Sequence, residues 1–187
     1  YGEKTYAEAG AEVAVTVSEA HGYGMLIAAS MAEHDSQAKD IFDGMYRYYK
    51  AHPSSIGPNL MAWQQTDNGS AIQNSAGADS ATDGDLDIAY ALLMADTVWG
   101  SDGAINYKQA ALAVMNDIMT YEVNQSDWVL QLGDWAHNTR EGDTYYAATR
   151  SSDFIVQYMP VFAEASGDTR WTTLYENTYR IINQMVD

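Results

Sequence analysis

The feature that most constrains the fold is a regular alternation of short and long connections between stretches with helical periodicity. Apolar residues recur every three to four positions in six stretches of this 187-residue chain, a spacing that places them on one side of a helix. The expected helices span residues 19–33, 36–50, 84–97, 106–121, 152–165 and 169–185. The connections are short at 34–35, 98–105 and 166–168 and long at 51–83 and 122–151. This pattern predicts an all-α chain of three antiparallel helical hairpins.

The apolar stripes indicate which side of each helix packs against its neighbours. In the first helix Tyr23, Leu26, Ile27 and Met31 can share a face. The stripes of the third and fourth helices contain Ile88, Ala91, Leu92, Ala95, Tyr107, Ala111, Val114 and Ile118. The pattern of residues 13–17 is compatible with a β-strand, and we expect no other strand.

An array of antiparallel hairpins places all the short turns at one end and both long loops at the other. The first, third and fifth helices then start beside the long loops, so we expect Glu19, Asp83 and Asp153 to meet on one face. Loops of this length in a compact domain are usually functional or disordered. This face is therefore where a functional site is expected.

The long loops are rich in aromatic residues. Three of the five tryptophans, Trp63, Trp128 and Trp135, lie in them, together with Tyr145 and Tyr146. Sugar rings stack on flat aromatic faces, but any single tryptophan is equally compatible with a core anchor that folds a loop down. Three tryptophans around a carboxylate-rich face favour a sugar-binding groove.

Charge excludes several classes of partner. Nine basic and 26 acidic residues leave a formal charge of -17, and this field opposes binding to nucleic acid or to an anionic membrane surface. The same field would attract a cationic polymer such as chitosan, although a solvated acidic surface gives the same count. No apolar stretch approaches the ~20 residues that cross a bilayer. We expect neither nucleic acid nor a membrane as a partner.

No metal and no other cofactor is expected. The chain has no cysteine, and its four histidines never fall at the i, i+4 spacing of a helical metal pair. The run from Asp83 to Asp87 has the Asp-x-Asp-x-Asp spacing of a calcium loop. However, its sixth and twelfth positions are Ile88 and Met94, where such a loop has glycine and glutamate.

Glu19 has the environment of a general acid. It stands near the start of an apolar helix in the segment from Ser18 to Met25, where we expect it to be partly desolvated and to keep a proton near neutral pH. The two glycines in this segment would let backbone or ligand approach closely. The helix dipole by itself also favours a glutamate at this position, so spacing alone does not make it catalytic.

Three segments resemble glycoside hydrolase family 8. They are Ser18 to Met25, Leu60-Met61-Ala62-Trp63 and the run ATDGDLDIAYALLMADTVWG at 81–100, which is similar to that family's signature. Weaker similarity continues through 132–135 and 149–154, in the order found in the chitosanase and glucanase branch. The resemblance spans nearly the whole chain from about residue 16.

The resemblance implies an (α/α)6 barrel and a secreted enzyme that cleaves β-1,4-linked polysaccharide internally, with inversion and without metal. The substrate would be cellulose, mixed-linkage β-glucan, chitosan or xylan, and the residues favour neutral β-glucan slightly over chitosan. Glu19 matches the general acid, and Asp83 matches a carboxylate that binds and helps distort the sugar at the cleavage point. The expected substrate-binding residues are Trp63, Trp135, Tyr23, His21, Asp134, Arg150 and Asp153.

Two departures from the family pattern matter. Ala20-His21 stands where the family usually has Gly-Gln, so His21 is expected to change the titration of the acid or the sugar contact. The family barrel has twelve helices, of which this chain supplies six. We expect a partial catalytic domain, with a leading segment at 1–17, three hairpins over 18–187, and the catalytic base in the remainder of the barrel. A start at Tyr1, without methionine or a signal-peptide pattern, agrees with a processed or partial chain.

Two other functions fit the same residues. One is a noncatalytic polysaccharide-binding module that kept the groove, and the other is a helical structural or interaction protein whose aromatics are core. Release of reducing sugar separates the enzyme from both, and carbohydrate affinity separates the two alternatives from each other.

Overall fold

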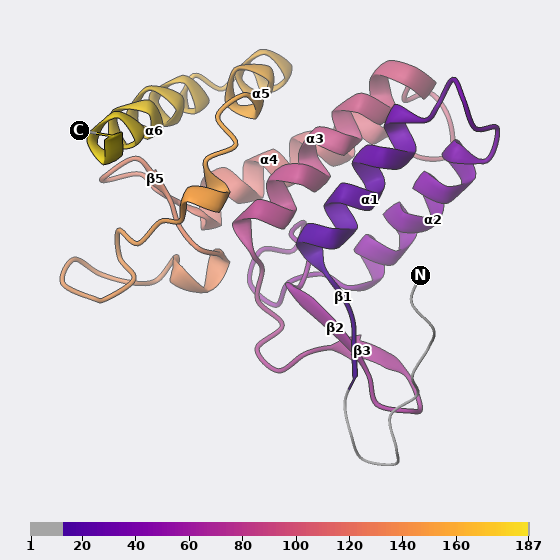
Figure 1. Ribbon diagram of the computed structural model, residues 1–187, viewed down its shortest axis with the longest axis horizontal. Coiled ribbons are helices and arrows are strands. Elements are labelled where there is room, and N and C mark those ends of the chain that lie inside the picture. The colour runs from indigo at the N-terminus through magenta and orange to yellow at the C-terminus, as the bar shows by residue number, and fades with distance from the viewer. Residues whose placement is uncertain (1–12, 187) are drawn as a thin grey trace.

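The computed structural model describes residues 13–186, which form three helical hairpins (Figure 1). The helices are α1 (Ser18–Ser30), α2 (Ala38–Ala51), α3 (Thr82–Trp99), α4 (Tyr107–Tyr121), α5 (Tyr158–Ser166) and α6 (Arg170–Val186). α1 packs on α2, α3 on α4 and α5 on α6, and the first two hairpins join through extensive contact between α1 and α3. The prediction of three hairpins is confirmed.

The helix α3 is the most deeply buried of the helices in the first two hairpins. α1 and α3 lie side by side at the centre of this part of the molecule (Figure 1), and most residues of α3 are buried. α2 buries only Ala38, Phe42 and Tyr49, as expected for a helix with one face in solvent. The predicted stripes of α3 and α4 are buried. The core therefore lies around α3.

Of the predicted face of α1, Leu26 packs partly against the core and the other three residues are open. Ile27 is 65% exposed, and Tyr23 and Met31 are also exposed, whereas Met25 and Ala28 lie in the core. The packed side is formed largely by small residues because α1 and α3 approach closely. The larger apolar side chains are left on a surface that nothing in the described part of the chain covers.

Two glycines set the separation of α1 and α3. A Cβ on Gly84 would lie 2.3 Å from Ser18 Oγ and 2.7 Å from the Ser18 carbonyl carbon, and a Cβ on Gly22 would lie 2.6 Å from Asp87 Cβ. Any side chain at either position would force the helices apart, at a cost typically of about 1–3 kcal/mol. The glycines thus hold the starts of the two helices together and bring Glu19 close to α3.

The fifth helix begins later than predicted. A short 3-10 turn at Ser151–Asp153 precedes it, and α5 itself starts at Tyr158. Pro160 explains the difference, because a helix from residue 152 would place it in the helix interior, where its ring clashes and a hydrogen bond is lost. A start at Tyr158 places Pro160 in the first turn, where no N–H is needed.

The long loops contain short strands that the sequence did not predict. β1 (Val13–Val17), the expected strand, pairs antiparallel with β2 (Gln64–Asp67), which pairs with β3 (Ile72–Asn74). A second pair joins β4 (Val123–Asn124) and β5 (Val129–Leu130). These strands are short, and β2 is entirely polar, so they carry no alternating apolar pattern. Of the expected leading segment, residues 1–12 lie outside the described residues.

Candidate active site

Glu19 lies where the first long loop meets the start of α1. It occupies the first turn of α1 and is exposed. The preceding residue, Ser18, donates its backbone N–H to the Trp63 carbonyl oxygen at 2.9 Å, which fixes the start of the helix against the loop. The partial desolvation expected for Glu19 is absent within the described residues, because this side of α1 is open.

Helical geometry separates the three carboxylates that open α3. Residues two apart on a helix point about 200° apart, so Asp85 is directed away from Asp83 and Asp87. Asp85 is fully buried and accepts a hydrogen bond from the Met61 N–H at 2.8 Å. Asp83 and Asp87 are on the side of Glu19, whose charge and that of Asp83 both raise the pKa of Asp87 after the larger effect of burial. Because Asp87 is buried, Asp83 is the member of the run that faces the open side.

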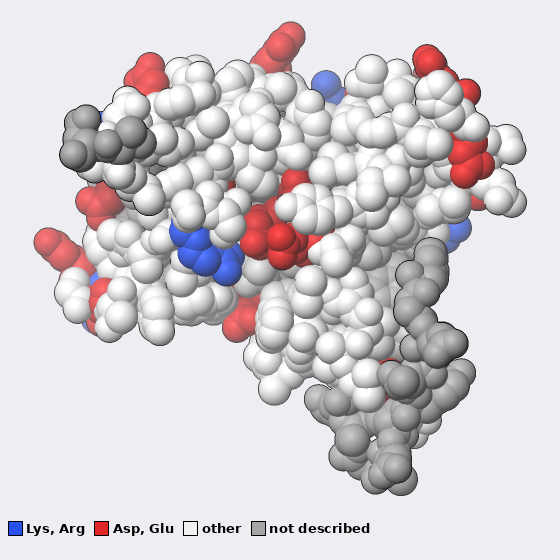
Figure 2. Space-filling view, viewed as in Figure 1, with Lys and Arg blue, Asp and Glu red and all other residues white. Residues whose placement is uncertain are grey.

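Arg150 links Asp83 to Asp153. Its guanidinium lies 3.7 Å from Asp83 Oδ1 and 3.2 Å from Asp153 Oδ1, and it donates a hydrogen bond to the Leu132 carbonyl oxygen at 3.3 Å. Burial raises the pKa of Asp153 to about 6, with Arg150 acting in the opposite direction. The topology therefore brings together carboxylates from α3 and from the second long loop. Figure 2 shows acidic atoms gathered at the centre of this face with basic atoms beside them.

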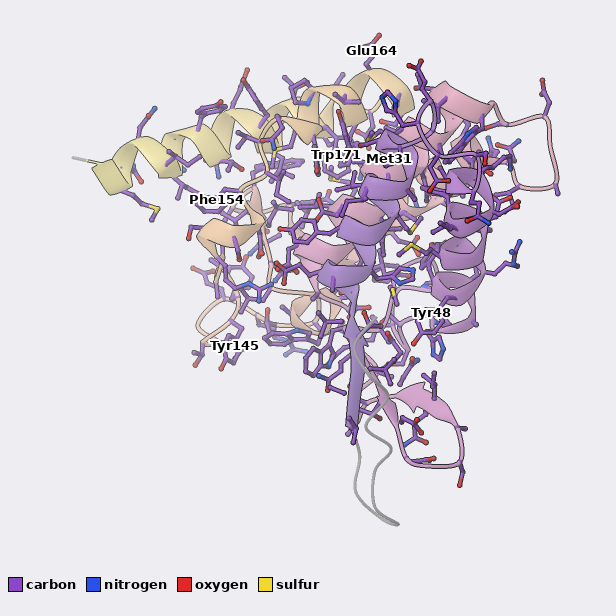
Figure 3. The ribbon with its side chains drawn as sticks, turned by 45° about the vertical axis from the view of Figure 1, so that its right-hand side comes forward. Met31, Tyr48, Tyr145, Phe154, Glu164 and Trp171 are labelled. Carbon is purple, nitrogen blue, oxygen red and sulfur yellow. The ribbon has the colours of Figure 1, made fainter. Side chains whose placement is uncertain are left out.

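Aromatic side chains border this acidic face. Trp63 is 37% exposed, and its backbone N–H donates to the Asp79 carbonyl oxygen at 2.7 Å. Tyr23, one helical turn after Glu19, is also exposed. Trp135 meets Tyr145 edge to face, with ring centroids 5.1 Å apart, and Figure 3 shows Tyr145 among the loops.

Three expected substrate-binding residues, His21, Asp134 and Asp153, lie inside the protein, and Asp153 is fully buried in its ion pair with Arg150. His21 is 6% exposed, its Nε2 is 3.0 Å from the Met45 carbonyl oxygen and its ring stacks on Tyr48. Its pKa is lowered, chiefly by burial. Asp134 is fully buried and accepts hydrogen bonds from the Gly57 and Ser80 N–H groups at 3.0 and 2.8 Å. In this structure His21 holds α1 against α2 and Asp134 ties the two long loops together, so neither lies on the open face.

Trp128 also lies apart from Glu19. It is partly buried against the hydrophobic core, and Asn177 of α6 donates a hydrogen bond to its carbonyl oxygen at 2.7 Å. The second long loop thus uses one tryptophan as an anchor on α6 and another, Trp135, nearer the acidic face.

Beneath the open face lies a buried pair of carboxyl groups, Asp85 and Glu122. Both side chains are fully buried and within hydrogen-bonding reach of each other, and Ser80 Oγ donates to Glu122 Oε1 at 2.5 Å. Within the described residues no N–H or O–H donor reaches Asp85 Oδ2 or Glu122 Oε2. A proton shared between the two carboxyls satisfies both. Burial raises the pKa of Glu122 to about 8, although the Ser80 hydrogen bond acts in the other direction.

This pair predicts a pH-dependent stability. The folded protein holds a proton that the unfolded chain releases, so the free energy of unfolding should fall as pH rises from the ordinary glutamate value of 4.5 to about 8. The slope for one proton is at most about 1.4 kcal/mol per pH unit. Glu122→Gln should flatten this dependence in denaturant unfolding of the complete protein, since the amide can still donate to Asp85. The exposed Glu164→Gln on α5 is the matched control, and equal slopes in all three proteins would contradict the shared proton.

Several residues around the site were not singled out from the sequence. Tyr158 donates a hydrogen bond to Asp87 Oδ1 at 2.9 Å from a position 71 residues away, and Glu122 meets Asp85 from the end of α4. The sequence could have indicated Asp87, because residues four apart share a helix face and Asp87 lies four residues after Asp83. For Tyr158 and Glu122 nothing local marked the contact.

Two further findings concern residues 13–186. No group of three histidine, aspartate or glutamate side chains there is arranged to hold a metal ion. No helix in the same range is both long enough and apolar enough to span a membrane.

Sequence comparison identifies relatives over most of this chain. The profile of the glycosyl hydrolases family 8 matches residues 6–187. The β-glucanase of Niallia circulans is 54% identical over 170 residues, which cover 91% of this chain and 40% of that protein. An endoglucanase of Bacillus sp. (strain KSM-330) is 44% identical over 163 residues, covering 87% of this chain and 33% of that protein.

Structure comparison agrees. The apo structure of a β-1,3-1,4-glucanase from Paenibacillus sp. X4 matches with a TM-score of 0.84 and 53% identity, covering 95% of this chain and 44% of that chain. A cold-adapted family 8 xylanase matches with a TM-score of 0.68 at 19% identity, which supports the fold alone. The chain spans less than half the length of these relatives, and its six helices correspond to part of their (α/α)6 barrel. Because the family profile matches nearly the whole chain, the chain belongs to family 8 of the glycosyl hydrolases.

Proposed function

We propose that residues 1–187 form the acid-bearing part of a secreted, endo-acting, inverting β-glucanase, with Glu19 as the general acid. The observation that carries this proposal is the position of Glu19 at the open start of α1, beside the Asp83–Arg150 pair and the exposed Trp63. The sequence supports the proposal as well, because the chain is 54% identical to a β-glucanase over 170 residues. The substrate of a β-glucanase is a polysaccharide chain, which is too large to enter a cell, so the enzyme would act outside it.

Glu19 is suited to meet the leaving oxygen of a bound polysaccharide. Cleavage of a glycosidic bond needs a carboxylic acid that protonates the leaving oxygen as the bond breaks. Among the described carboxyls on this face, Asp83 is ion-paired and Asp87 is buried, whereas Glu19 is exposed. A sugar ring bound over Glu19 would exclude water from the carboxyl group.

Asp83 and Arg150 are suited to hold the sugar at the cleavage point. The ion pair orients the Asp83 carboxylate at the start of α3, where it can accept hydrogen bonds from sugar hydroxyls. Hydrogen bonds of this kind that strengthen in the transition state add to catalysis.

The second carboxyl of the reaction, which activates water, belongs in our proposal to the remainder of the barrel. An inverting site holds its two carboxyls about 6.5–9.5 Å apart, on opposite sides of the sugar. Asp83 and Asp87 come from the helix next to Glu19 on the same wall, so they are not placed across a sugar from it. In our proposal this segment therefore needs the other helices of the barrel to supply the second carboxyl.

For substrate we propose mixed-linkage β-1,3-1,4-glucan ahead of chitosan. Two relatives that are 54% and 44% identical in sequence are named β-glucanase and endoglucanase, and the structure with 53% identity is a β-1,3-1,4-glucanase. The net charge of -17 would attract chitosan, but it is equally typical of a solvated acidic surface.

The proposal is tested by reducing-sugar release from mixed-linkage glucan, a soluble cellulose derivative and chitosan, using the complete enzyme. We expect fast release from the mixed-linkage polymer, with a rapid fall in viscosity that indicates internal cleavage. Proton NMR during the first turnovers should show the α-anomer appearing first. Activity confined to chitosan would overturn the substrate, and a β-anomer appearing first would overturn the inverting mechanism.

Trp63→Ala should weaken oligosaccharide binding by about 1–3 kcal/mol, by analogy with the loss of other aromatic stacking platforms. The change removes an exposed ring, so the melting temperature should change little. Calorimetric titration with a mixed-linkage oligosaccharide, alongside a melting curve, measures both quantities.

Trp128→Ala is the matched control for Trp63→Ala. Because Trp128 packs against the core and α6, its loss should lower the melting temperature and leave the affinity nearly unchanged. If Trp63→Ala behaved in the same way as this control, Trp63 would be a loop anchor and not a sugar platform.

A further inference from the structure

Asp134 joins the second long loop to both ends of the first. Its side chain is fully buried, and its two carboxyl oxygens face different parts of the first loop. Oδ2 accepts hydrogen bonds from the Gly57 N–H at 3.0 Å and from the Ser54 hydroxyl, and Oδ1 accepts the Ser80 N–H at 2.8 Å. The Asp134 N–H in turn donates to Ser80 Oγ at 3.1 Å. Residues 54–57 open the first loop and Ser80 closes it, so one buried side chain holds both of its ends.

Trp63 lies in the stretch of the first loop between these two anchors. Its N–H donates at 2.7 Å to the carbonyl oxygen of Asp79, the residue before Ser80. The residue before Trp63, Ala62, forms an antiparallel bridge with Ser80 itself. The backbone of Trp63 therefore takes its position from the segment that Asp134 holds.

Trp135 directly follows Asp134 in the 3-10 turn Asp134–Ala136. The preceding residue, Gly133, brings the second loop into close contact with the first. A Cβ on Gly133 would lie 2.2 Å from the Ser80 carbonyl oxygen and 2.9 Å from Trp135 Nε1. The two loops are thus in backbone contact beside Trp135, and this one buried contact determines where both tryptophans stand.

The donors around Asp134 require a carboxyl group at this position. The N–H groups of Gly57 and Ser80 belong to the backbone, so they cannot turn away, and they meet different oxygens of the side chain. An asparagine has one oxygen and one NH2 group. Its NH2 group would face one of these two N–H groups and leave a buried donor without an acceptor, which is costly. One of the two ends of the first loop would then have to move away from the second loop.

We propose that Asp134 is a positioning residue for the substrate: it sets the spacing between Trp63 and Trp135, so that sugar rings of one glucan chain can stack on both. This inference rests on the proposed function and takes Trp135, like Trp63, as a sugar platform. Two platforms strengthen the binding of one chain only when their separation matches that chain. Asp134 is fully buried and does not itself touch the substrate.

The test compares KM and kcat for hydrolysis of mixed-linkage glucan by the complete enzyme and its variants. Asp134→Asn should raise KM on the order of tenfold, because a displaced ring loses much of its stacking on the sugar. It should lower kcat much less, since Glu19 lies on α1, outside this contact. Gly133→Ala keeps the carboxyl group but forces the loops apart, so it should also raise KM, and it replaces Asp134→Asn in every comparison if that variant does not fold.

A second background separates positioning from a general loss of stability. In Trp135→Ala one platform is gone, so the spacing between the two no longer matters. Asp134→Asn should then change KM by less than about twofold, which is the scatter expected when no coupling remains. An equal rise of KM in both backgrounds would overturn the inference, and so would an unchanged KM in Asp134→Asn.

Asp117→Asn is the matched control, because Asp117 is also a buried aspartate that binds the first loop. The backbone N–H and the side-chain NH2 group of Asn59 both donate to its Oδ2, at 2.8 and 3.1 Å, so an amide oxygen can accept both. KM should therefore stay unaltered, and a tenfold rise here would also overturn the inference. An unaltered enzyme with no activity on any β-glucan would instead overturn the proposed function, so the two failures are distinguishable.

Discussion

Replacing Glu19 by glutamine in the complete enzyme should lower kcat by about 10²- to 10⁴-fold, because general-acid catalysis is typically worth that much. The amide keeps the shape and hydrogen-bonding capacity of the side chain but has no proton to give to the leaving oxygen. The change lies at an exposed position in the first turn of α1, so neither the fold nor the packing of α1 on α3 should be disturbed. The dissociation constant for a mixed-linkage oligosaccharide should stay close to that of the unaltered enzyme.

Two measurements make this result specific. Glu33→Gln, an exposed position in the turn after α1, makes the same change at the other end of the helix and should leave kcat unaltered. An aryl glycoside with a good leaving group needs less protonation, so Glu19→Gln should be much less impaired on it. Near-normal hydrolysis of polysaccharide by Glu19→Gln would remove Glu19 as the acid, and an equal loss on both substrates would indicate a defect other than proton donation.

Residues 1–187 produced alone should release no reducing sugar from any β-glucan. The carboxylates on the same face as Glu19 are an ion-paired Asp83 and a buried Asp87 from the adjacent helix, so no described carboxyl is placed to activate water across a sugar. The same chain exposes large apolar side chains, with Ile27 65% exposed on α1 and Met185 67% exposed on α6. Apolar surfaces of this kind favour association, so we also expect self-association or low stability.

Sedimentation velocity and a turnover assay on the purified 187-residue chain test both parts of this expectation. Adding the separately produced remainder of the barrel should restore activity and suppress self-association, because it would cover the open face of α1 and supply the base. A stable monomer that hydrolyses β-glucan by itself would contradict the proposal that the base lies elsewhere.

The helices and their pairing were predictable because their signals are local. A stripe with a 3.6-residue period depends only on residues within one helix, and alternating short and long connections are sufficient to imply hairpins. The same topology places the start of α3 next to Arg150, whose guanidinium lies 3.7 Å from Asp83 and 3.2 Å from Asp153. The motif at 81–100 indicated the family, and the match over residues 6–187 confirms it.

Other features depended on segments far apart in the chain. The periodicity of the sequence revealed an apolar stripe on α1 but not which way it faces. The close contact at Gly22 and Gly84 determined that small residues pack inward and large ones remain outside. The strands of the long loops are two to four residues long and are held by backbone hydrogen bonds to other segments, so they are too short to show a side-chain period.

The sequence by itself therefore determined the helical hairpins, the family and the identity of the acidic face, since periodicity and motif are properties of short stretches. Only the tertiary structure decided the environment of each acid on that face. Glu19 is open to solvent, Asp85 lies against Glu122 in the core, and Asp87 is held by Tyr158 between the helices. The physical reason is that the charge state of a carboxyl depends on burial and on neighbours supplied by distant segments, and neither is encoded in the spacing of the residues around it.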